Sequence, residues 1–390
     1  MRSRTVIFFT ILFLLFLYTG TKAGNLLPAH SSLAWILSIV LFALMVGWQF
    51  VYRLEIQSAE SYWFRFLAWG GSLSLGLWTT FMLFSIPVDI VYLFLSVLQN
   101  FGASEINPIH SRWMSLGLFG FSAGIVGLGF IETITGPKVK EVSVPIPDLP
   151  EQLYGIRIAQ ITDLHIGPTI RRGYVEQVVR QVMELEPDLI AVTGDLADGT
   201  PEALEQHLQP LAELKAPLGT YYITGNHEYY WGATQWLETA RNLGFIPLIN
   251  ENRVVTIDGV NLLIAGVTDT SAHHFIPAHH SDPQKAAVSH QACLLKLLLA
   301  HRPDSCFDAE PAGFDLQLSG HTHGGQFFPW NLIVRLVHKY YRGLNRHGNM
   351  WVYVNAGTGY WGPAHRFAVP SEITLLRIVP DMQYNLQITA

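Results

Sequence analysis

Residues 155–165 read GIRIAQITDLH, an apolar run that ends directly in Asp163 and His165. A short apolar run bounded by turn residues is typical of a buried strand. The same pattern returns at 188–195 (DLIAVTGD), 220–228 (TYYITGNHE), 294–301 (LLKLLLAH) and 315–323 (DLQLSGHTH). In every case polar residues follow where the predicted strand ends.

Amphipathic stretches lie between these runs. Tyr174–Leu185 places four valines on one face, and Glu202–Leu214 is a second predicted helix. Further predicted strands are Asn261–Val267, Trp351–Asn355 and Glu372–Ile378. Strands that alternate with helices indicate a layered α/β fold, here over 151–380.

The first third of the chain has a different composition. The whole chain is 14% charged, against roughly 25% for soluble domains, and only 11 charged residues fall in 1–136. A membrane span needs about 20 mostly apolar residues. We therefore predict an N-terminal transmembrane domain over 1–136, followed by a proline-rich linker at 137–150. Its predicted helices are 5–22, 33–52, 66–87 and 113–131, of which the first is alternatively a signal peptide.

The positions of Lys and Arg predict how the chain is oriented in the membrane, because the cytoplasmic loops of membrane proteins carry an excess of both residues. With four spans and an inner N-terminus, only Lys22 and Arg112 lie outside, and the inner side holds Arg2, Arg4, Arg53, Arg65, Lys138 and Lys140. This predicts a multi-pass protein of the inner cell membrane with its C-terminal domain in the cytoplasm. We interpret Val88–Leu98, which contains Asp89, as a helix extension or surface helix, since a separate crossing would reverse the orientation.

The polar clusters follow the carboxyl ends of predicted strands, where open α/β sheets place their sites. Imidazole and carboxylate together suit Mn, Fe, Zn or similar divalent ions. Four histidines, two aspartates and one asparagine are too many ligands for one tetrahedral ion. Two neighbouring ions that share a carboxylate would use all seven, and such a pair clamps phosphate. The candidate metal ligands are Asp163, His165, Asp195, Asn226, His301, His321 and His323.

The order D-x-H, G-D, G-N-H-E, H, G-H-x-H resembles the calcineurin-like metallophosphoesterase superfamily. LSGHTHGGQ, with LLLAHRPD upstream, resembles its membrane-associated phosphodiesterase branch, which includes transmembrane proteins with such a domain. The resemblance covers roughly 150–380 and implies a two-sheet β sandwich flanked by helices.

The resemblance also implies a role for each candidate. Asp163, His165 and His323 would bind a first divalent ion, and Asn226, His301 and His321 a second, with Asp195 bridging the two. His227 is similar to the family's non-ligand histidine, which stabilises the phosphate or protonates the leaving oxygen. Family members of this kind use a bridging hydroxide as the nucleophile, so neither Cys293 nor Cys306 is needed for that role.

Other polar positions leave alternatives open. Asp198 is interpreted as a turn residue before a helix, and His273, His274, His279 and His280 as a solvated loop. His365-Arg366 is either a basic pair facing phosphate or an ordinary surface pair. The apolar stretch 327–342 with interspersed bases has the composition of an interfacial helix. A packed loop or core helix is the favoured interpretation there.

These observations predict a membrane-anchored dimetal phosphohydrolase that cleaves phosphodiester or pyrophosphate bonds, with a lipid as the preferred substrate class. One alternative is a tethered phosphodiesterase for soluble small molecules. Another is a membrane sensor or transporter with a regulatory phosphoesterase-like domain, although spans with so little charge argue against a transport pathway. The acidic C-terminal part argues against a nucleic-acid partner. The sequence does not predict the oligomeric state.

Overall fold

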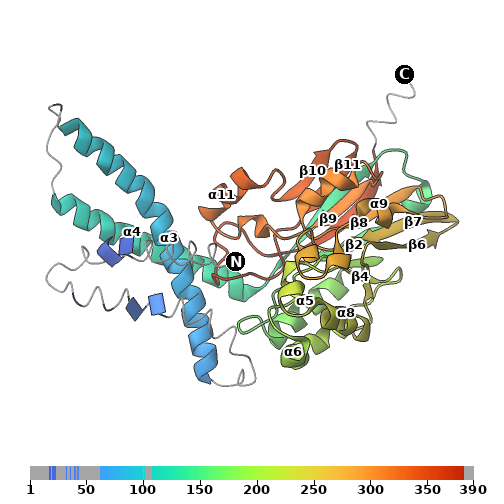
Figure 1. Cartoon of the computed structure of the whole chain (residues 1–390), viewed down its shortest axis with the longest axis horizontal. Helices are drawn as coiled ribbons and strands as arrows, with labels where there is room; N and C mark the ends of the chain where they lie inside the picture. Colours follow the sequence, from blue (N-terminus) through green and yellow to red (C-terminus); the bar gives the residue numbers. More distant parts are fainter. Residues whose placement is uncertain are drawn as a thin grey trace. The chain divides into compact units, whose positions relative to one another are not determined.

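The computed structural model describes residues 62–99, 101 and 108–381, and scattered positions from 17 to 43. The chain divides into two compact units. The helix unit comprises 1–131 and 362–367, and the α/β unit comprises 132–361 and 368–390. Figure 1 shows the elements of both, with labels on many of them.

Two long helices dominate the described part of the helix unit. They are α3 (Tyr62–Gln99) and α4 (Pro108–Thr135). Both contain a segment long and apolar enough to cross a membrane, Tyr62–Gln99 and Trp113–Thr135. Helix α3 continues through Pro87, so Val88–Leu98 extends the preceding helix. At 1.5 Å per residue, α3 is about 57 Å long, nearly twice the roughly 30 Å hydrocarbon core of a bilayer. The predicted helices 5–22 and 33–52 lie largely outside the described residues.

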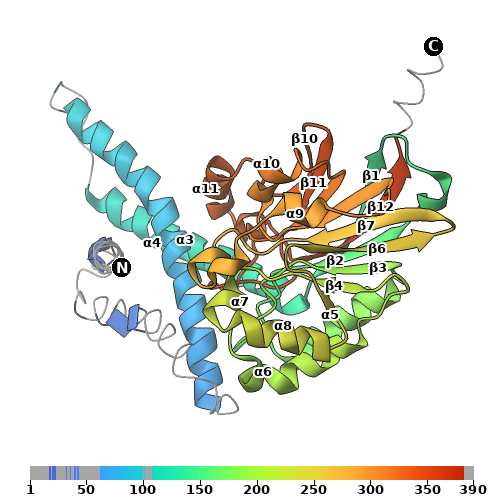
Figure 2. The same ribbon diagram turned by 45° about the vertical axis from the view of Figure 1, so that its right-hand side comes forward.

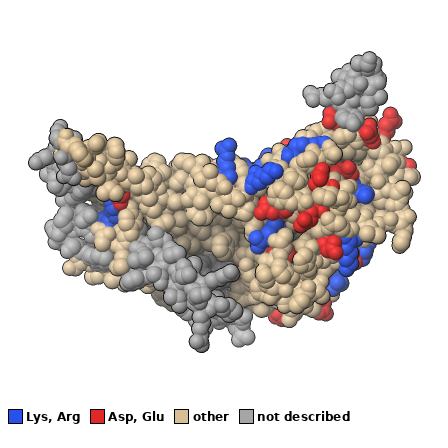
Figure 3. All heavy atoms as spheres, turned by 45° about the horizontal axis from the view of Figure 1, so that its top comes forward, with Lys and Arg blue, Asp and Glu red and all other residues tan. Residues whose placement is uncertain are grey.

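Aromatic contacts join α3 to α4. The ring centroids of Trp69 and Phe130 lie 5.4 Å apart, and those of Phe81 and Phe119 5.8 Å apart. The charge of Asp89 is compensated inside this unit, because its carboxylate forms an ion pair with Lys22 and accepts a hydrogen bond from Tyr18. In Figure 3 charged side chains gather over the α/β unit and are almost absent from the visible described surface of α3 and α4.

The helix unit also includes a segment from the far end of the sequence. Residues 362–367 contact both long helices, since Ser72 Oγ donates to Gly362 O and Arg366 N donates to Gly129 O at 2.9 Å. His365 and Arg366 are fully buried. The interpretation of this pair as an ordinary surface pair is therefore wrong, and these contacts do not support a position facing phosphate.

The first sheet of the α/β unit has six strands in the order β1, β12, β2, β3, β4, β5. Strands β2 to β5 are parallel, whereas β12 runs antiparallel to β2. The bounds are β1 Lys138–Ile146, β2 Arg157–Ile161, β3 Leu189–Val192, β4 Thr220–Tyr222, β5 Ile246–Pro247 and β12 Glu372–Pro380.

The second sheet has six strands in the order β10, β11, β9, β8, β7, β6. Its four central strands are parallel, and both edge strands are antiparallel to their neighbours. The bounds are β6 Glu251–Ile257, β7 Val260–Gly266, β8 Leu295–Leu299, β9 Leu316–Ser319, β10 Gly343–His347 and β11 Met350–Val354.

The two sheets share one hydrophobic core. Ile158 and Leu189 from the first sheet belong to the same buried cluster as Leu262, Leu297 and Leu318 from the second. Figures 1 and 2 show α5, α6 and α8 beside the first sheet, and α9 beside the second. The prediction of a two-sheet sandwich flanked by helices is confirmed.

Helices and short 3-10 turns complete the α/β unit. The α-helices are α5 Arg172–Glu184, α6 Pro201–Leu208, α7 Asn226–Tyr230, α8 Ala233–Asn242, α9 Pro283–Ala287, α10 Cys306–Ala309 and α11 Trp330–Val337. The 3-10 turns are η2 Glu151–Leu153, η3 Gln209–Glu213, η4 Ala272–His274, η5 Pro277–His279, η6 Pro303–Ser305 and η7 His323–Gly325.

One predicted element is wrong. Most of the expected linker 137–150 forms β1, which pairs in parallel with β12 from Lys138 opposite Glu372 to Ile146 opposite Pro380. Pro145 is tolerated because β1 lies at the edge of the sheet, where a missing N–H need not break the ladder.

Candidate metal centre

Five strand ends carry the candidate site. Strands β2, β3 and β4 of the first sheet, and β8 and β9 of the second, each end just before predicted ligands. The backbone at these exits is unusual, because φ is positive at Asp163, His165, Asp195, His321 and His323. Side chains other than glycine seldom adopt this conformation, and it concentrates at functional sites. The sharp turns hold each polar side chain against the end of its strand.

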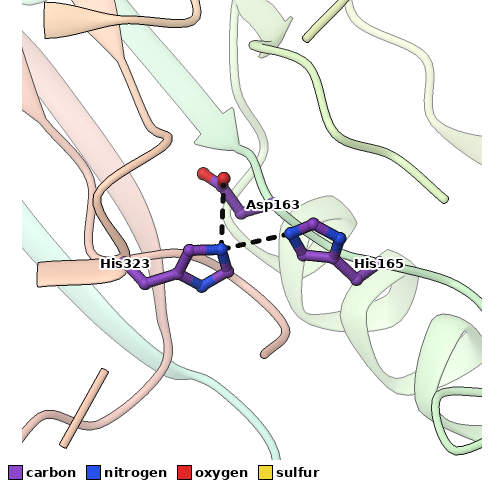
Figure 4. A group of neighbouring side chains, drawn as sticks. All are labelled: Asp163, His165 and His323. Carbon is purple, nitrogen blue, oxygen red and sulfur yellow. Dashed lines mark hydrogen bonds and ion pairs between the residues drawn. The ribbon is translucent and has the colours of Figure 1, made fainter. Parts of the chain in front are cut away.

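The first group of donor atoms comes from Asp163, His165 and His323, whose ligand atoms all lie within 4.8 Å of one another. His323 Nε2 lies 3.1 Å from His165 Nε2 and 3.4 Å from Asp163 Oδ1 (Figure 4). The three side chains point toward one another from β2 and from η7, which follows β9. The structure therefore unites the three residues expected for the first ion.

The second group comprises Asp195, His301 and His321. Asp195 Oδ2 lies 3.2 Å from His301 Nε2 and 3.9 Å from His165 Nε2, so it faces a histidine of each group. This position, between the two groups, is the one expected for a bridging carboxylate.

Asn226 begins α7, which follows β4. A Cβ atom on the preceding Gly225 would lie 2.1 Å from Asp195 Oδ1, so only glycine permits this close approach of α7 to the carboxylate. The backbone N–H of His227 donates to the same Asp195 oxygen at 2.9 Å. All seven predicted ligands thus lie at neighbouring strand exits.

The donor atoms fit divalent metal binding. Within the described part of the chain, the buried Oδ1 of Asn226 has no hydrogen-bond partner, and the buried Nε2 of His301 faces only the Asp195 carboxylate, at 3.2 Å. Buried polar atoms are rarely left unsatisfied unless an ion or water completes them. Ligands bound at about 2.0–2.1 Å to one centre lie about 3.0–3.4 Å apart, which agrees with the donor separations in the first group. The separations of His323 from His165 and from Asp163, and the unpaired Asn226 oxygen, are those of ligands around a cation.

His227 lies between both groups. Its Nδ1 is bonded to Asp198, and its Nε2 lies 3.8 Å from Asp195 Oδ2. With His165 and Asp195 it forms a third group of donors within 4.8 Å. Geometry alone therefore permits His227 either as a ligand or as the proton donor predicted from the sequence.

Neighbouring charges and burial shift the pKa values of the aspartates and histidines in the site. Burial alone would raise the pKa of Asp195, but His301 and His227 outweigh it and hold that pKa well below the usual range. Burial lowers the pKa of His227 and of His301, yet Asp195 and other carboxylates raise each to about 10. Burial raises the pKa of Asp163. Before metal binds, the site thus holds protonated His227 and His301 beside ionised Asp195.

Asp198 and Glu228 hold the donors in place. Asp198 Oδ2 accepts a hydrogen bond from His165 Nδ1 at 3.0 Å. Fully buried Glu228 accepts from the backbone N–H of Asp195, Leu196 and Gly225, which ties the β3 exit to the β4 exit. Sequence reasoning assigned neither role, although Glu228 belongs to the quoted G-N-H-E motif.

Exposed aromatic rings border His227. Its ring centroid lies 5.2 Å from that of Tyr230 and 5.5 Å from that of Trp361, and Phe275 lies 5.6 Å from Tyr230. All three aromatic side chains are about half exposed. Gln326 fixes the backbone of Trp361 through two hydrogen bonds, one to N and one to O. Local sequence does not indicate this rim, because its members lie far apart in the chain, at the end of α7 (Tyr230) and on two separate loops.

The histidine-rich loop lies apart from these donor groups. None of the three donor groups found among the described residues contains His273, His274, His279 or His280. These four side chains are exposed or partly exposed.

Comparisons with known proteins show which family this chain resembles. A family described as calcineurin-like phosphoesterase matches residues 156–325. An uncharacterized metallophosphoesterase of Helicobacter pylori is 37% identical over 295 residues, which cover 73% of this chain and 77% of that protein. A Danio rerio transmembrane protein with metallophosphoesterase domain is 31% identical over 370 residues, covering 91% and 82% of the two chains. Among solved structures, the Thermus thermophilus sulfate thiohydrolase SoxB gives a TM-score of 0.37 at 15% identity, covering 60% of this chain and 58% of that one.

The chain belongs to the calcineurin-like metallophosphoesterase family of hydrolases. It combines the metal-binding α/β domain of that family with two candidate membrane-spanning helices.

Proposed function

We propose that this chain is a membrane-anchored phosphoesterase that holds two divalent metal ions and hydrolyses phosphodiester or pyrophosphate bonds. The observation that carries the proposal is the position of Asp195 between two donor groups, with the buried Oδ1 of Asn226 unpaired among the described residues. Asp163, His165 and His323 hold the first ion, and Asn226, His301 and His321 the second, with Asp195 shared.

When bound, two such ions supply positive charge to the phosphate oxygens and lower the pKa of a water molecule. The chain's own residues supply the proton. His227 has its Nδ1 held by Asp198, and in the metal-free site Asp195 and Asp198 raise its pKa to about 10 against the effect of burial. In the proposed reaction a water molecule first loses a proton to solvent, and the hydroxide oxygen bonds to phosphorus as the bond to the leaving oxygen breaks. That oxygen takes the His227 proton, and His227 regains a proton from solvent.

We further propose that the substrate's leaving group is apolar, with a lipid as the preferred class. Tyr230 and Trp361 border the proposed proton donor with half-exposed rings, so an apolar group there loses contact with water. A phosphodiesterase for soluble small molecules is the second candidate, since the same rim also suits an aryl group.

For localisation we propose a multi-pass protein of the inner membrane with the catalytic domain in the cytoplasm. Two candidate spans and relatives named transmembrane proteins support the membrane anchor. The Lys and Arg distribution supports the orientation.

The test uses the full chain, stripped of metal and then reloaded with Mn, Fe or Zn. Turnover is measured with bis(p-nitrophenyl) phosphate, with p-nitrophenyl phosphate and with a vesicle-borne phospholipid. We expect activity on diesters only after reloading, and faster turnover of the lipid. Faster hydrolysis of the monoester than of the diester would overturn the proposed cleavage of phosphodiester bonds. If the diesters are cleaved but the lipid is not preferred, the result would favour a phosphodiesterase for soluble small molecules.

A further inference from the structure

Helix α11 (Trp330–Val337) leaves its apolar side chains in contact with solvent. All eight of its residues are described, and none of them is buried. Leu336 is 86% exposed, Val337 71% and Leu332 50%. Single exposed aliphatic residues are ordinary, but contiguous patches mark interaction surfaces.

The helix is oriented opposite to a normal surface helix. At 100° per residue, Leu332, Ile333, Leu336 and Val337 share one continuous arc, and Asn331 and Arg335 lie on the other side. A Cβ atom added to Gly325, the last residue of η7, would lie only 2.3 Å from the Cα of Asn331, so Asn331 packs closely against η7. Asn331 therefore turns toward η7, while the apolar arc and Arg335 at its edge are exposed.

Basic residues flank the apolar arc. Residues 327–347 contain no Asp or Glu, yet include Arg335, Lys339, Arg342 and Arg346. Arg335 and Lys339 are exposed, and the Lys339 ammonium lies over the rings of Phe307 and Tyr340, at 5.3 and 5.1 Å. An apolar arc beside cations is complementary to a lipid surface with anionic headgroups.

We propose that α11 is a membrane-docking helix, whose aliphatic arc enters the lipid interface while Arg335 and Lys339 contact anionic headgroups. The candidate spans of the same chain keep a bilayer within reach. A second copy is a poorer occupant, because an isologous contact would bring the Arg335 and Lys339 charges of both copies together without acidic partners in 327–347.

This role would bring the lipid surface close to the metal centre. Helix α11 packs on η7, whose first residue is the ligand His323. His338, which follows α11, lies with its ring centroid 6.1 Å from that of His321. Docking goes beyond the proposed function, because it requires no turnover and is measured without substrate.

The test places a polarity-sensitive NBD probe on the full chain in nanodiscs that contain anionic lipid. Cys293 is first replaced by Ser so that the probe reacts only with the introduced cysteine. Cys306 is buried and is left unchanged. The probe is attached at Leu336→Cys and, as the matched control, at Val288→Cys, which replaces an aliphatic residue 67% exposed. Lipids that carry a doxyl quencher report contact with the acyl region.

We expect blue-shifted emission and quenching at least twofold stronger for the Leu336 probe than for the Val288 probe. Adding Arg335→Glu and Lys339→Glu should reduce that quenching, with the melting temperature as a check on folding. Equal, weak quenching at both positions would overturn the proposal. Cross-linking of Leu336→Cys between two copies, without lipid quenching, would instead identify a second copy as the occupant.

Discussion

His165 and His227 are bonded to the same carboxylate. Asp198 accepts from the Nδ1 atom of His165 through one oxygen and binds Nδ1 of His227 through the other. Both rings consequently direct Nε2 toward the metal centre, where His165 is a candidate ligand and His227 the candidate acid. Such partners fix the tautomer and orientation of the ring. Asp198 therefore acts on metal binding and on proton transfer at once.

Asp198→Asn tests this double role. Loss of the charge should weaken binding of the first ion about 10–100-fold, the range for an outer partner of a ligand. It should also lower the pKa of His227, which Asp198 helps to raise. His227 must be protonated to act as an acid, so the basic limb of the kcat/KM profile should move to lower pH. Metal titration and the pH profile measure the two effects, and a variant unchanged in both would contradict the role.

His227→Ala separates a proton donor from a ligand. The variant should keep both ions yet lose roughly 10²–10⁴-fold in kcat, the usual contribution of general acid catalysis. A substrate with a good leaving group, such as p-nitrophenolate, should be less affected than an alkyl diester, because it needs no proton. Metal content and kcat are measured on the same sample. Loss of one ion would assign His227 to the ligand group that it forms with His165 and Asp195.

Metal binding should release protons. In the metal-free site Asp195 and Asp163 raise the pKa of His301 to about 10 against the effect of burial, so the ring is protonated at neutral pH. Only the neutral ring binds metal, so affinity should rise with pH up to about 10. Calorimetric titrations in two buffers of different ionisation enthalpy count the protons released. Identical heats in both buffers would contradict a protonated His301.

Topology gives a further prediction. A C-terminal alkaline phosphatase fusion should be inactive, and a C-terminal fluorescent protein fusion bright, because the basic residues predict a cytoplasmic C-terminus. The orientation does not depend on cleavage of the first apolar stretch. An active phosphatase fusion with a dark fluorescent one would mean an exported domain.

The strands and site residues that can be predicted from the sequence are those whose evidence lies within a few neighbouring residues. Each strand and its ligand lie within a few residues, so GIRIAQITDLH alone indicates both β2 and the Asp163-His165 pair. Strand β1 was missed because its evidence is not local. Its proline and lysines are typical of a linker, and only the distant β12 makes it a strand.

Which side of an element faces the protein is not encoded locally either. The pattern of 327–342 indicates an amphipathic helix, but a packed segment was the favoured interpretation, and α11 instead turns its apolar arc outward. Asp198 was interpreted as a turn residue because nothing nearby in sequence shows that two histidines share its carboxylate.

The shared carboxylate is the central claim, and the most direct measurement is the number of ions per chain in the wild type and in Asp195→Asn, read by mass spectrometry beside turnover. A neutral amide bridges two cations poorly. We predict two ions per chain in the wild type, and reduced occupancy at both positions with turnover abolished in Asp195→Asn. Near-wild-type turnover with both ions still bound to Asp195→Asn would contradict the account.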